Sequence, residues 1–529
     1  MFDTLIRGGR IIDGTGAPAF TGDVAILGGK LSVFPGGTDA QAKMVIDAQG
    51  KCVCPGFIDV HSHADLFFLN PLVHNTAKIS QGVTAEVAGQ CGLSDFPTRS
   101  CDGALYARHK QEQSRLNVLK PAQTDTFAGY RKYIESVNKA THIKQLVGHG
   151  CIRRAVMGSE NREATPQELE MMKSLLREAM ENGAAGLSSG LVYPPGVFTK
   201  AHELTELCKV VAEYGGVYTS HMRDEGQGLL ESIRETLDTA MAAGCRLNIS
   251  HLKAMGVPAW GLSEKALQMI EDAAAKGLDV VYDVYPFTAS MTSFQACLPP
   301  KEHTFTREER TARLKDPVIR EEIKQALRNG ESLKFSTLRS LDDVLLIDCP
   351  VTVQYRGKTV AQVAREQGID PVDAMLDILA ENACATNCVY FTMNEADLTA
   401  FFLHDRAMVC TDGLVHSLTE STHPRGFCAF PQAIDLFVRK KQCISLEKAI
   451  EKMTSFPARW HGFDNKGQLK DGYDADVLIF DPETIAPGFT YGENIRLCPG
   501  IEKVFVDGVL TYENGALTGA YPGRFIPNK

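Results

Sequence analysis

The middle of the chain alternates helical patterns with short apolar runs, and this alternation constrains the fold more than any other feature. One unit begins at Thr165, which together with Pro166 and Glu168 predicts a helix start with a capping box. Apolar residues follow at helical spacing until Gly183, and residues 185–188 then predict a strand. Repeated units of a helix followed by a strand are typical of a parallel sheet.

Eight strands of this kind can be identified, which predicts an α/β fold of the (β/α)8 TIM-like barrel type. In such a barrel the active site lies at the C-terminal ends of the strands. The expected strand ends lie near His61, Ala88, His149, Ser188, His221, His251, Tyr285 and Asp412.

The two ends of the chain have a different pattern, rich in short strands and tight turns. Residues 23–34 predict a hairpin that turns at Gly28-Gly29, and similar strands return after residue 465, around Asp507-Gly508. We therefore expect residues 1–54 and 465–529 to form one small β-sandwich domain, with the barrel occupying residues 55–464.

One interval of the predicted barrel, between Tyr285 and Ala407, contains far more chain than a single helix requires. Residues 306–330 predict charged helical structure within it. We expect an insertion over about 288–345, after the seventh strand, that is either a solvated surface element or a lid over the site.

Composition excludes several classes of partner. The net charge of −10, without a run of Lys or Arg, argues against nucleic acid or an anionic membrane as principal partner. No apolar run reaches transmembrane length, and the first residues lack a signal-peptide core. The 15 cysteines show no disulfide-framework spacing, so we expect reduced thiols and a cytoplasmic protein. The sequence makes no prediction of the oligomeric state.

Candidate metal ligands lie at the expected strand ends. His61 and His63 alternate after an apolar strand and therefore project from one face. An isolated pair of this kind is more often a solvated polar strand end than a metal site. However, His221, His251 and Asp412 each close another strand, and five good ligands on one barrel face predict a metal centre.

Cys91 is a sixth candidate, just after the second strand and among glycines. A thiolate at this position could bridge two metals, and zinc suits a mixture of sulfur, imidazole and carboxylate ligands. From spacing alone, a buried apolar cysteine is the more frequent finding.

Taken together, these residues resemble the amidohydrolase superfamily and, within it, the D-aminoacylases, or N-acyl-D-amino-acid deacylases. The resemblance covers nearly the whole chain. It is carried by residues 55–65, 81–92, 147–150, 186–195, 220–225, 250–253, 285–289 and 518–524, together with Asp412 and the two β-rich ends.

The resemblance implies that one zinc ion is held tightly and a second more weakly. The principal position would use Cys91, His221 and His251, and the weaker one would use His61, His63 and Asp412. Asp412 would also accept the proton of the attacking water. Gln90 stands where the family has Asn, beside Cys91, and could alter metal occupancy.

The resemblance also implies a substrate-binding set. Lys253 and Arg425 would hold the α-carboxylate of the substrate, Tyr285 could join them, and Tyr193 could help to stabilise the tetrahedral oxyanion. Each of these residues also has a surface or packing interpretation.

The expected function is therefore zinc-dependent hydrolysis of a small-molecule N-acyl-D-amino acid to a carboxylate and a free D-amino acid. One alternative keeps the fold but opens cyclic amides, as in dihydroorotase or hydantoinase. That chemistry uses a carboxylated lysine, for which Lys144 is the candidate, although its position before the strand end favours a solvated side chain. A second alternative is a non-catalytic scaffold. His149 and Arg153 are expected to support the site through hydrogen bonds.

Overall fold

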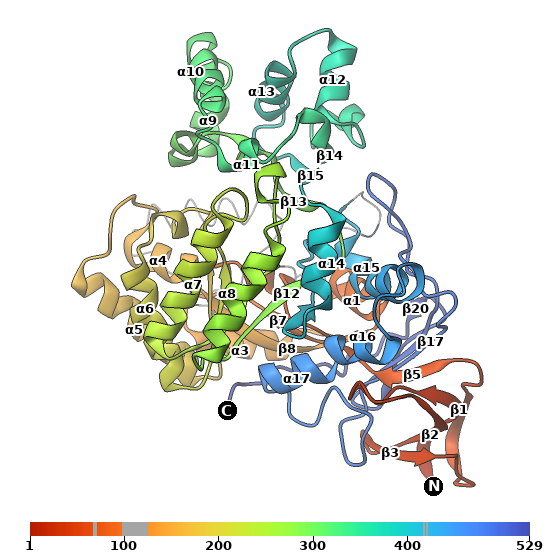
Figure 1. Ribbon diagram of the computed structural model, residues 1–529. Helices are drawn as coiled ribbons and strands as arrows, with labels where there is room; N and C mark the ends of the chain where they lie inside the picture. The colour runs from red at the N-terminus through yellow and green to blue at the C-terminus, as the bar shows by residue number, and fades with distance from the viewer. Residues whose placement is uncertain (67–70, 98–124, 416–417, 419–421) are drawn as a thin grey trace.

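The parallel strands of the computed structural model form one eight-stranded sheet that curves into a barrel (Figure 1). The structure describes residues 1–66, 71–97, 125–415, 418 and 422–529. Each strand ends close to a position expected from the sequence. The strands are, in order around the barrel, β6 (Phe57–Asp59), β7 (Val83–Ala88), β8 (His142–Gly148), β9 (Gly186–Gly190), β10 (Val217–His221), β11 (Arg246–Ile249), β12 (Val280–Val284) and β16 (Ala407–Val409).

Contacts between the first and last strands close the barrel. Ser62 and Gly413 form a parallel bridge just beyond these strands, and the Asp412 N–H donates to the His61 carbonyl at 2.9 Å. The Asp59 carboxylate accepts a hydrogen bond of 2.6 Å from the Thr411 hydroxyl. The segments that carry the first and last predicted ligands are therefore fixed to each other.

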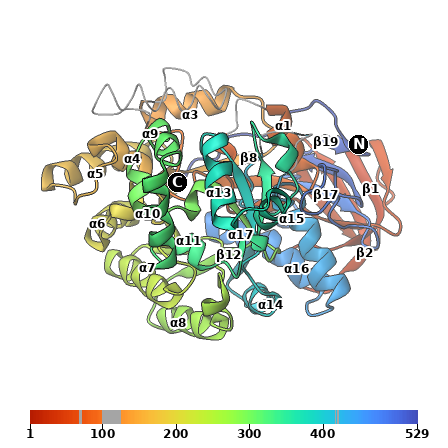
Figure 2. The ribbon, with the colours of Figure 1, turned by 90° about the horizontal axis from the view of Figure 1, so that it is seen from above.

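Helices surround the barrel, as the view from above shows for α4 to α8 (Figure 2). The helix predicted at Thr165 has the expected capping box, in which the Thr165 side chain and Glu168 bond each other's backbone N–H. The helices are α1 (Pro71–Ile79), α3 (Phe127–Ser136), α4 (His149–Met157), α5 (Pro166–Glu181), α6 (Ala201–Glu213), α7 (Leu229–Ala243), α8 (Ser263–Ala275), α14 (Glu395–Leu403), α15 (Arg425–Ala433), α16 (Leu446–Met453) and α17 (Ser455–His461).

Strands from both termini join in a nine-stranded sheet with its own apolar core. β17 pairs antiparallel with β5, so the late strands continue the early ones, and the expected β2–β3 hairpin pairs Leu27 with Lys30. The strands are β1 (Phe2–Ile11), β2 (Phe20–Leu27), β3 (Lys30–Pro35), β4 (Ala42–Asp47), β5 (Cys52–Pro55), β17 (Val477–Phe480), β18 (Ile501–Val506), β19 (Val509–Glu513) and β20 (Ala516–Leu517).

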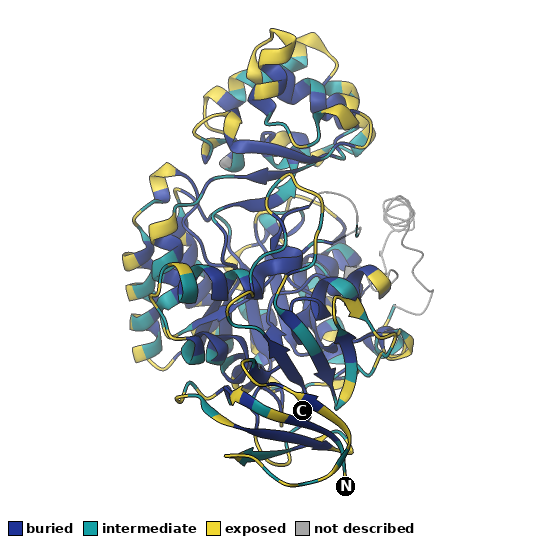
Figure 3. Cartoon of the chain, turned by 90° about the vertical axis from the view of Figure 1, so that its right-hand side faces the viewer, coloured by how far each residue is buried: buried dark blue, intermediate teal, exposed yellow. Residues whose placement is uncertain are grey.

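A separate unit, called the inserted unit here, lies between β12 and β16 and sits above the strand ends in Figure 1. It has its own buried core, visible as dark blue segments in Figure 3. It continues past the expected range of 288–345, because β15 pairs between β13 and β14. Its elements are β13 (Ser290–Ser293), α9 (Arg307–Arg313), α10 (Pro317–Arg328), α11 (Leu333–Ser336), β14 (Val344–Asp348), α12 (Val360–Gln367), α13 (Pro371–Glu381) and β15 (Asn387–Tyr390).

Two further observations bear on the sequence-based expectations. Every cysteine within the described residues is a free thiol. Among the same residues, no helix is both long enough and apolar enough to cross a membrane.

Candidate metal centre

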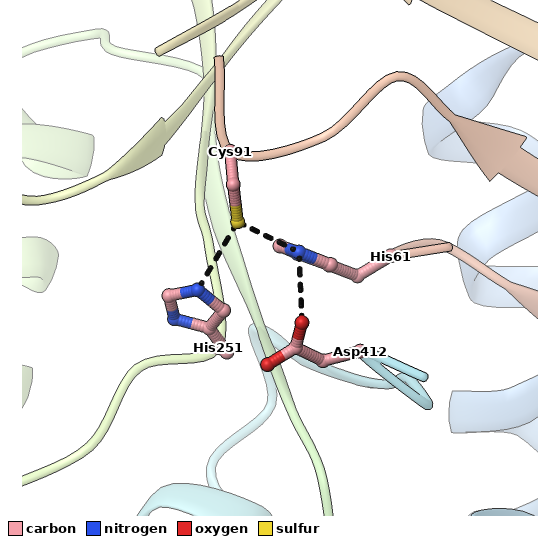
Figure 4. A group of neighbouring side chains, drawn as sticks. All are labelled: His61, Cys91, His251 and Asp412. Carbon is pink, nitrogen blue, oxygen red and sulfur yellow. Dashed lines mark hydrogen bonds and ion pairs between the residues drawn. The ribbon is translucent and has the colours of Figure 1, made fainter. Parts of the chain in front are cut away.

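Four side chains that follow different barrel strands meet at one point (Figure 4). The Cys91 Sγ lies 3.3 Å from the His61 Nε2 and 3.4 Å from the His251 Nε2. The Asp412 Oδ1 lies 3.6 Å from the same His61 nitrogen. All four residues are buried. Potential metal ligands from β6, β7, β11 and β16 are thus brought together, as expected for the C-terminal face of a barrel.

His63 and His221 extend this cluster, His63 beside Asp412 and His221 beside His251. The His63 Nε2 lies 3.2 Å from the Asp412 Oδ1, and the His221 Nδ1 lies 3.0 Å from the His251 Nε2. All six residues expected to be ligands therefore occupy one continuous site.

The backbone at three of these residues adopts a conformation that is unfavourable for side chains with a Cβ. Cys91, His251 and Asp412 have φ values of +56°, +33° and +45°. Such strain costs about 1–3 kcal/mol per residue, and its occurrence at three residues of one cluster is typical of a functional site. Specific hydrogen bonds hold two of them, since the His251 N–H donates to the Asp283 Oδ1 at 2.8 Å and the Asp412 N–H to the His61 carbonyl.

The electrostatics of the cluster favour a thiolate at Cys91 and a carboxylate at Asp412. Burial raises the pKa of Cys91, but the imidazoles of His61 and His251 outweigh burial and hold this pKa well below its usual range. Burial likewise raises the pKa of Asp412, but the Arg425 guanidinium, 2.8 Å away, outweighs it and holds the pKa well below the usual range. A thiolate, imidazoles and a carboxylate in close contact fit zinc.

Lys253, Arg425 and Tyr285 adjoin the cluster. The Tyr285 ring centroid lies 4.7 Å from the Arg425 Cζ and 5.7 Å from the Lys253 Nζ. The Tyr285 hydroxyl is buried, and among the described residues it has no hydrogen-bond partner. Tyr193 packs edge-on against His221, with 5.1 Å between ring centroids. The four expected substrate-binding residues therefore surround the ligands.

The comparison with protein families agrees with this geometry. Residues 44–512 match the model of the amidohydrolase family. The chain belongs to this family. A D-aminoacylase of Alcaligenes xylosoxydans xylosoxydans is 31% identical, over 99% of this chain and 97% of the relative. An N-acyl-D-aspartate deacylase of the same organism is also 31% identical, over 99% of this chain and 95% of the relative.

A solved structure shares the whole architecture of this amidohydrolase. It is the N-acyl-D-glutamate deacylase of Bordetella bronchiseptica, complexed with zinc and a phosphonate inhibitor that mimics the tetrahedral intermediate of the reaction. The TM-score is 0.82 at 31% identity, and the match covers 99% of each chain.

Two carboxylates of the amidohydrolase site were not identified from the sequence. The Asp283 Oδ1 lies 3.3 Å from the His61 Nδ1, and the Glu225 Oε1 lies 2.9 Å from the His251 Nδ1. Glu225 also accepts a hydrogen bond of 2.5 Å from Lys253. A carboxylate behind an imidazole fixes its tautomer and orientation. The sequence does contain one signal for Asp283, which is a single acidic residue within an apolar strand. A buried carboxylate requires a polar partner, so its presence there indicates a contact with another polar side chain.

Three other expectations need correction. Lys144 is buried rather than solvated, near the start of β8, and its ammonium lies 5.5 Å from the Phe463 ring centroid. Burial lowers its pKa to about 8. His149 and Arg153 bond Glu203 of α6, with His149 at 2.8 Å, and not the six expected ligands. The sequence spacing placed them near a strand end, but α4 begins there and both side chains bond the neighbouring helix α6.

Proposed function

We propose that this amidohydrolase hydrolyses the amide bond of N-acyl-D-amino acids, giving a carboxylate and a free D-amino acid. The observation that carries the proposal is a six-residue ligand cluster beside two buried cations, Lys253 and Arg425. Relatives that act on N-acyl-D-amino acids match this chain over nearly its whole length. The free thiols of the described residues support a reducing, cytoplasmic location.

Zinc would be held principally by Cys91, His221 and His251, and a weaker second position would use His61, His63 and Asp412. The Cys91 sulfur lies within 3.4 Å of an imidazole of each group, which supports a bridging role for this thiolate between the two positions. When bound, zinc acidifies a water molecule and polarises the scissile carbonyl.

Asp412 would accept the proton of the attacking water and return it to the departing amine. Its low pKa means that it is ionised at neutral pH and able to accept. Arg425 holds one carboxylate oxygen at 2.8 Å, which leaves the other oxygen directed to His63 and the ligand cluster.

The α-carboxylate of the substrate would bind Lys253, Arg425 and the Tyr285 hydroxyl. A buried hydroxyl without a partner in the described part of the chain is costly unless a ligand bonds it, which supports this assignment. Burial raises the pKa of Tyr193, so its phenol stays protonated and can donate to the developing oxyanion.

Cyclic-amide hydrolysis receives less support. A carboxylated lysine in such a site must reach the metal ligands, whereas the Lys144 ammonium lies against Phe463. The complete ligand set also disfavours a non-catalytic scaffold, which has no need of strained backbone at Cys91, His251 and Asp412.

The test is a panel of N-acetyl-D- and N-acetyl-L-amino acids, with zinc quantified on the same preparation and Asp412→Asn as the inactive control. We expect turnover of D-substrates with about one or two zinc ions per chain. Turnover of hydantoin or dihydroorotate without turnover of any N-acyl-D-amino acid would contradict the proposal. So would zinc-loaded protein that is inactive on every substrate.

A further inference from the structure

A lysine from the inserted unit reaches the ligand face of the barrel. Lys334 lies on the short helix α11, and its Nζ is 3.1 Å from the Ser290 Oγ and 3.2 Å from the Met255 Sδ. The same nitrogen lies 4.3 Å above the Tyr390 ring centroid. Met255 belongs to the loop that carries Lys253, and its N–H donates to the Glu225 carbonyl at 2.8 Å. Lys334 therefore contacts the loop that positions the α-carboxylate clamp.

The three cationic side chains near this loop differ in whether they have an ion-pair partner. Lys253 pairs with Glu225, and Arg425 pairs with Asp412. Lys334 is partly buried, and no carboxylate of the described residues forms an ion pair with it; its neighbours are a hydroxyl, a thioether and an aromatic ring. Withdrawing an ammonium from water without an anion is costly, and a bound anion removes that cost.

Lys334 nevertheless keeps its charge near neutral pH. Burial, together with the neighbouring cations Lys253 and Arg425, lowers its pKa only to about 8. At pH 7 most molecules therefore carry an ammonium group at this position, against the loop that carries Lys253.

We infer that Lys334 is a specificity-determining residue that binds a carboxylate at the end of the substrate's D-side chain, with Ser290 as a second donor. The preferred substrates are then N-acyl derivatives of acidic D-amino acids. This inference rests on the proposed function and narrows it. Sequence similarity does not distinguish acidic from other D-side chains, because three relatives named for different substrates each share 31% identity with this chain.

The experiment compares kcat/KM for N-acetyl-D-glutamate with that for its uncharged isostere, N-acetyl-D-glutamine, and adds N-acetyl-D-aspartate and N-acetyl-D-methionine. The enzymes are wild type, Lys334→Met, Lys334→Gln and Lys334→Arg. Lys358→Met serves as the matched control, because Lys358 belongs to the same unit but pairs with Glu366 at 2.7 Å. The comparison of N-acetyl-D-aspartate with N-acetyl-D-glutamate shows which length of substrate side chain places its carboxylate at Lys334.

We expect the D-glutamate to D-glutamine ratio, or the corresponding ratio for D-aspartate, to exceed ten in the wild type. It should fall about 10- to 100-fold in Lys334→Met and Lys334→Gln, the range of one charge-assisted hydrogen bond. Lys334→Arg should retain most of the ratio, and Lys358→Met should not change it. Turnover of D-methionine should remain within a few-fold in every variant, which shows that the variants fold.

The outcomes separate this inference from the proposed function. Equal losses on charged and uncharged substrates, or an unchanged ratio, would mean that Lys334 only docks the inserted unit, and would overturn the inference alone. Wild-type protein with bound zinc that turns over none of these substrates would overturn the proposed function and the inference with it.

Discussion

Cys91 occupies the centre of the ligand cluster, in contact with imidazoles from two other strands. We predict that Cys91→Ala loses most bound zinc and most activity while the barrel still folds, because a bridging thiolate serves both proposed positions. Zinc content and circular dichroism of the variant check this. Normal zinc and turnover in Cys91→Ala would leave Cys91 as a buried packing residue.

Asp412 gives a second prediction at the residue scale. In Asp412→Asn the amide cannot accept a proton, so kcat should fall by about 10²–10⁴-fold. Zinc at the Cys91, His221 and His251 position should remain, which metal analysis measures. A kcat within a few-fold of wild type would show that another residue is the general base.

Asp283 is predicted to act through the ligands that it holds. Its carboxylate contacts the His61 imidazole and accepts the His251 N–H. In Asp283→Asn, zinc affinity should fall by about 10- to 100-fold, the usual cost of losing such a partner. The measurement is zinc competition with a chelator. An unchanged affinity with reduced stability would assign Asp283 a purely structural role.

The sequence pointed to the six clustered candidate ligands more readily than to the carboxylates that contact them. A candidate ligand at a barrel strand end is marked by its position. Asp283 within β12 and Glu225 in the loop after β10 are recognised only because the fold places each carboxylate beside an imidazole nitrogen. Cys91 shows what residue spacing alone cannot decide. It is buried, as a cysteine in an apolar core would be, but it also lies among imidazoles that favour the thiolate. Only the three-dimensional arrangement separates those two descriptions.

At the scale of elements, local signals were sufficient for helices and strand ends. The capping box of α5 is one such signal, and it yields a prediction that involves no site residue. Thr165→Ala should lower the free energy of unfolding by about 1 kcal/mol and leave kcat/KM unchanged. Denaturant unfolding tests the expected loss of stability, and steady-state kinetics test the unchanged kcat/KM. A loss of activity in this variant would indicate coupling between α5 and the site.

The inserted unit was harder to delimit from the sequence. Its sheet pairs Ser290 of β13 with Tyr390 of β15, so its two ends meet only in the folded protein. The helices α12 and α13 carry the same amphipathic pattern as barrel helices, and local periodicity cannot assign them to one core or the other. Nothing in the spacing indicated that Lys334 would contact the barrel loop at Met255.

At the scale of the whole molecule, a buried ionic cluster joins the terminal sheet to the barrel. The His142 Nε2 on β8 lies 3.4 Å from both Asp476 and Asp507, and Lys466 bonds Asp476 at 2.8 Å. Burial lowers the pKa of His142, but Asp476 outweighs it, so that the net effect raises this pKa above its usual value. The junction is thus stabilised by a protonated imidazole.

The sign of the pH dependence follows from that shift. A raised folded-state pKa contributes stability that is fully present below about pH 6.5 and is lost as the pH rises through the folded-state pKa. The stability difference between wild type and His142→Gln should therefore shrink between pH 6 and pH 9, as measured by denaturant unfolding. A difference that grows with pH would contradict a charged His142.

The closure of the barrel has a consequence for how the protein matures. The Thr411 N–H donates to the Asp59 carboxylate across 352 residues of chain, and ligands stand on both sides of this seam. Contacts so distant in sequence form late, because the loop-closure entropy must be overcome first. A chain whose last barrel strand has not yet paired therefore has an incomplete set of candidate metal ligands. A metal ion that binds the complete cluster but not the incomplete one would shift the folding equilibrium toward the closed barrel.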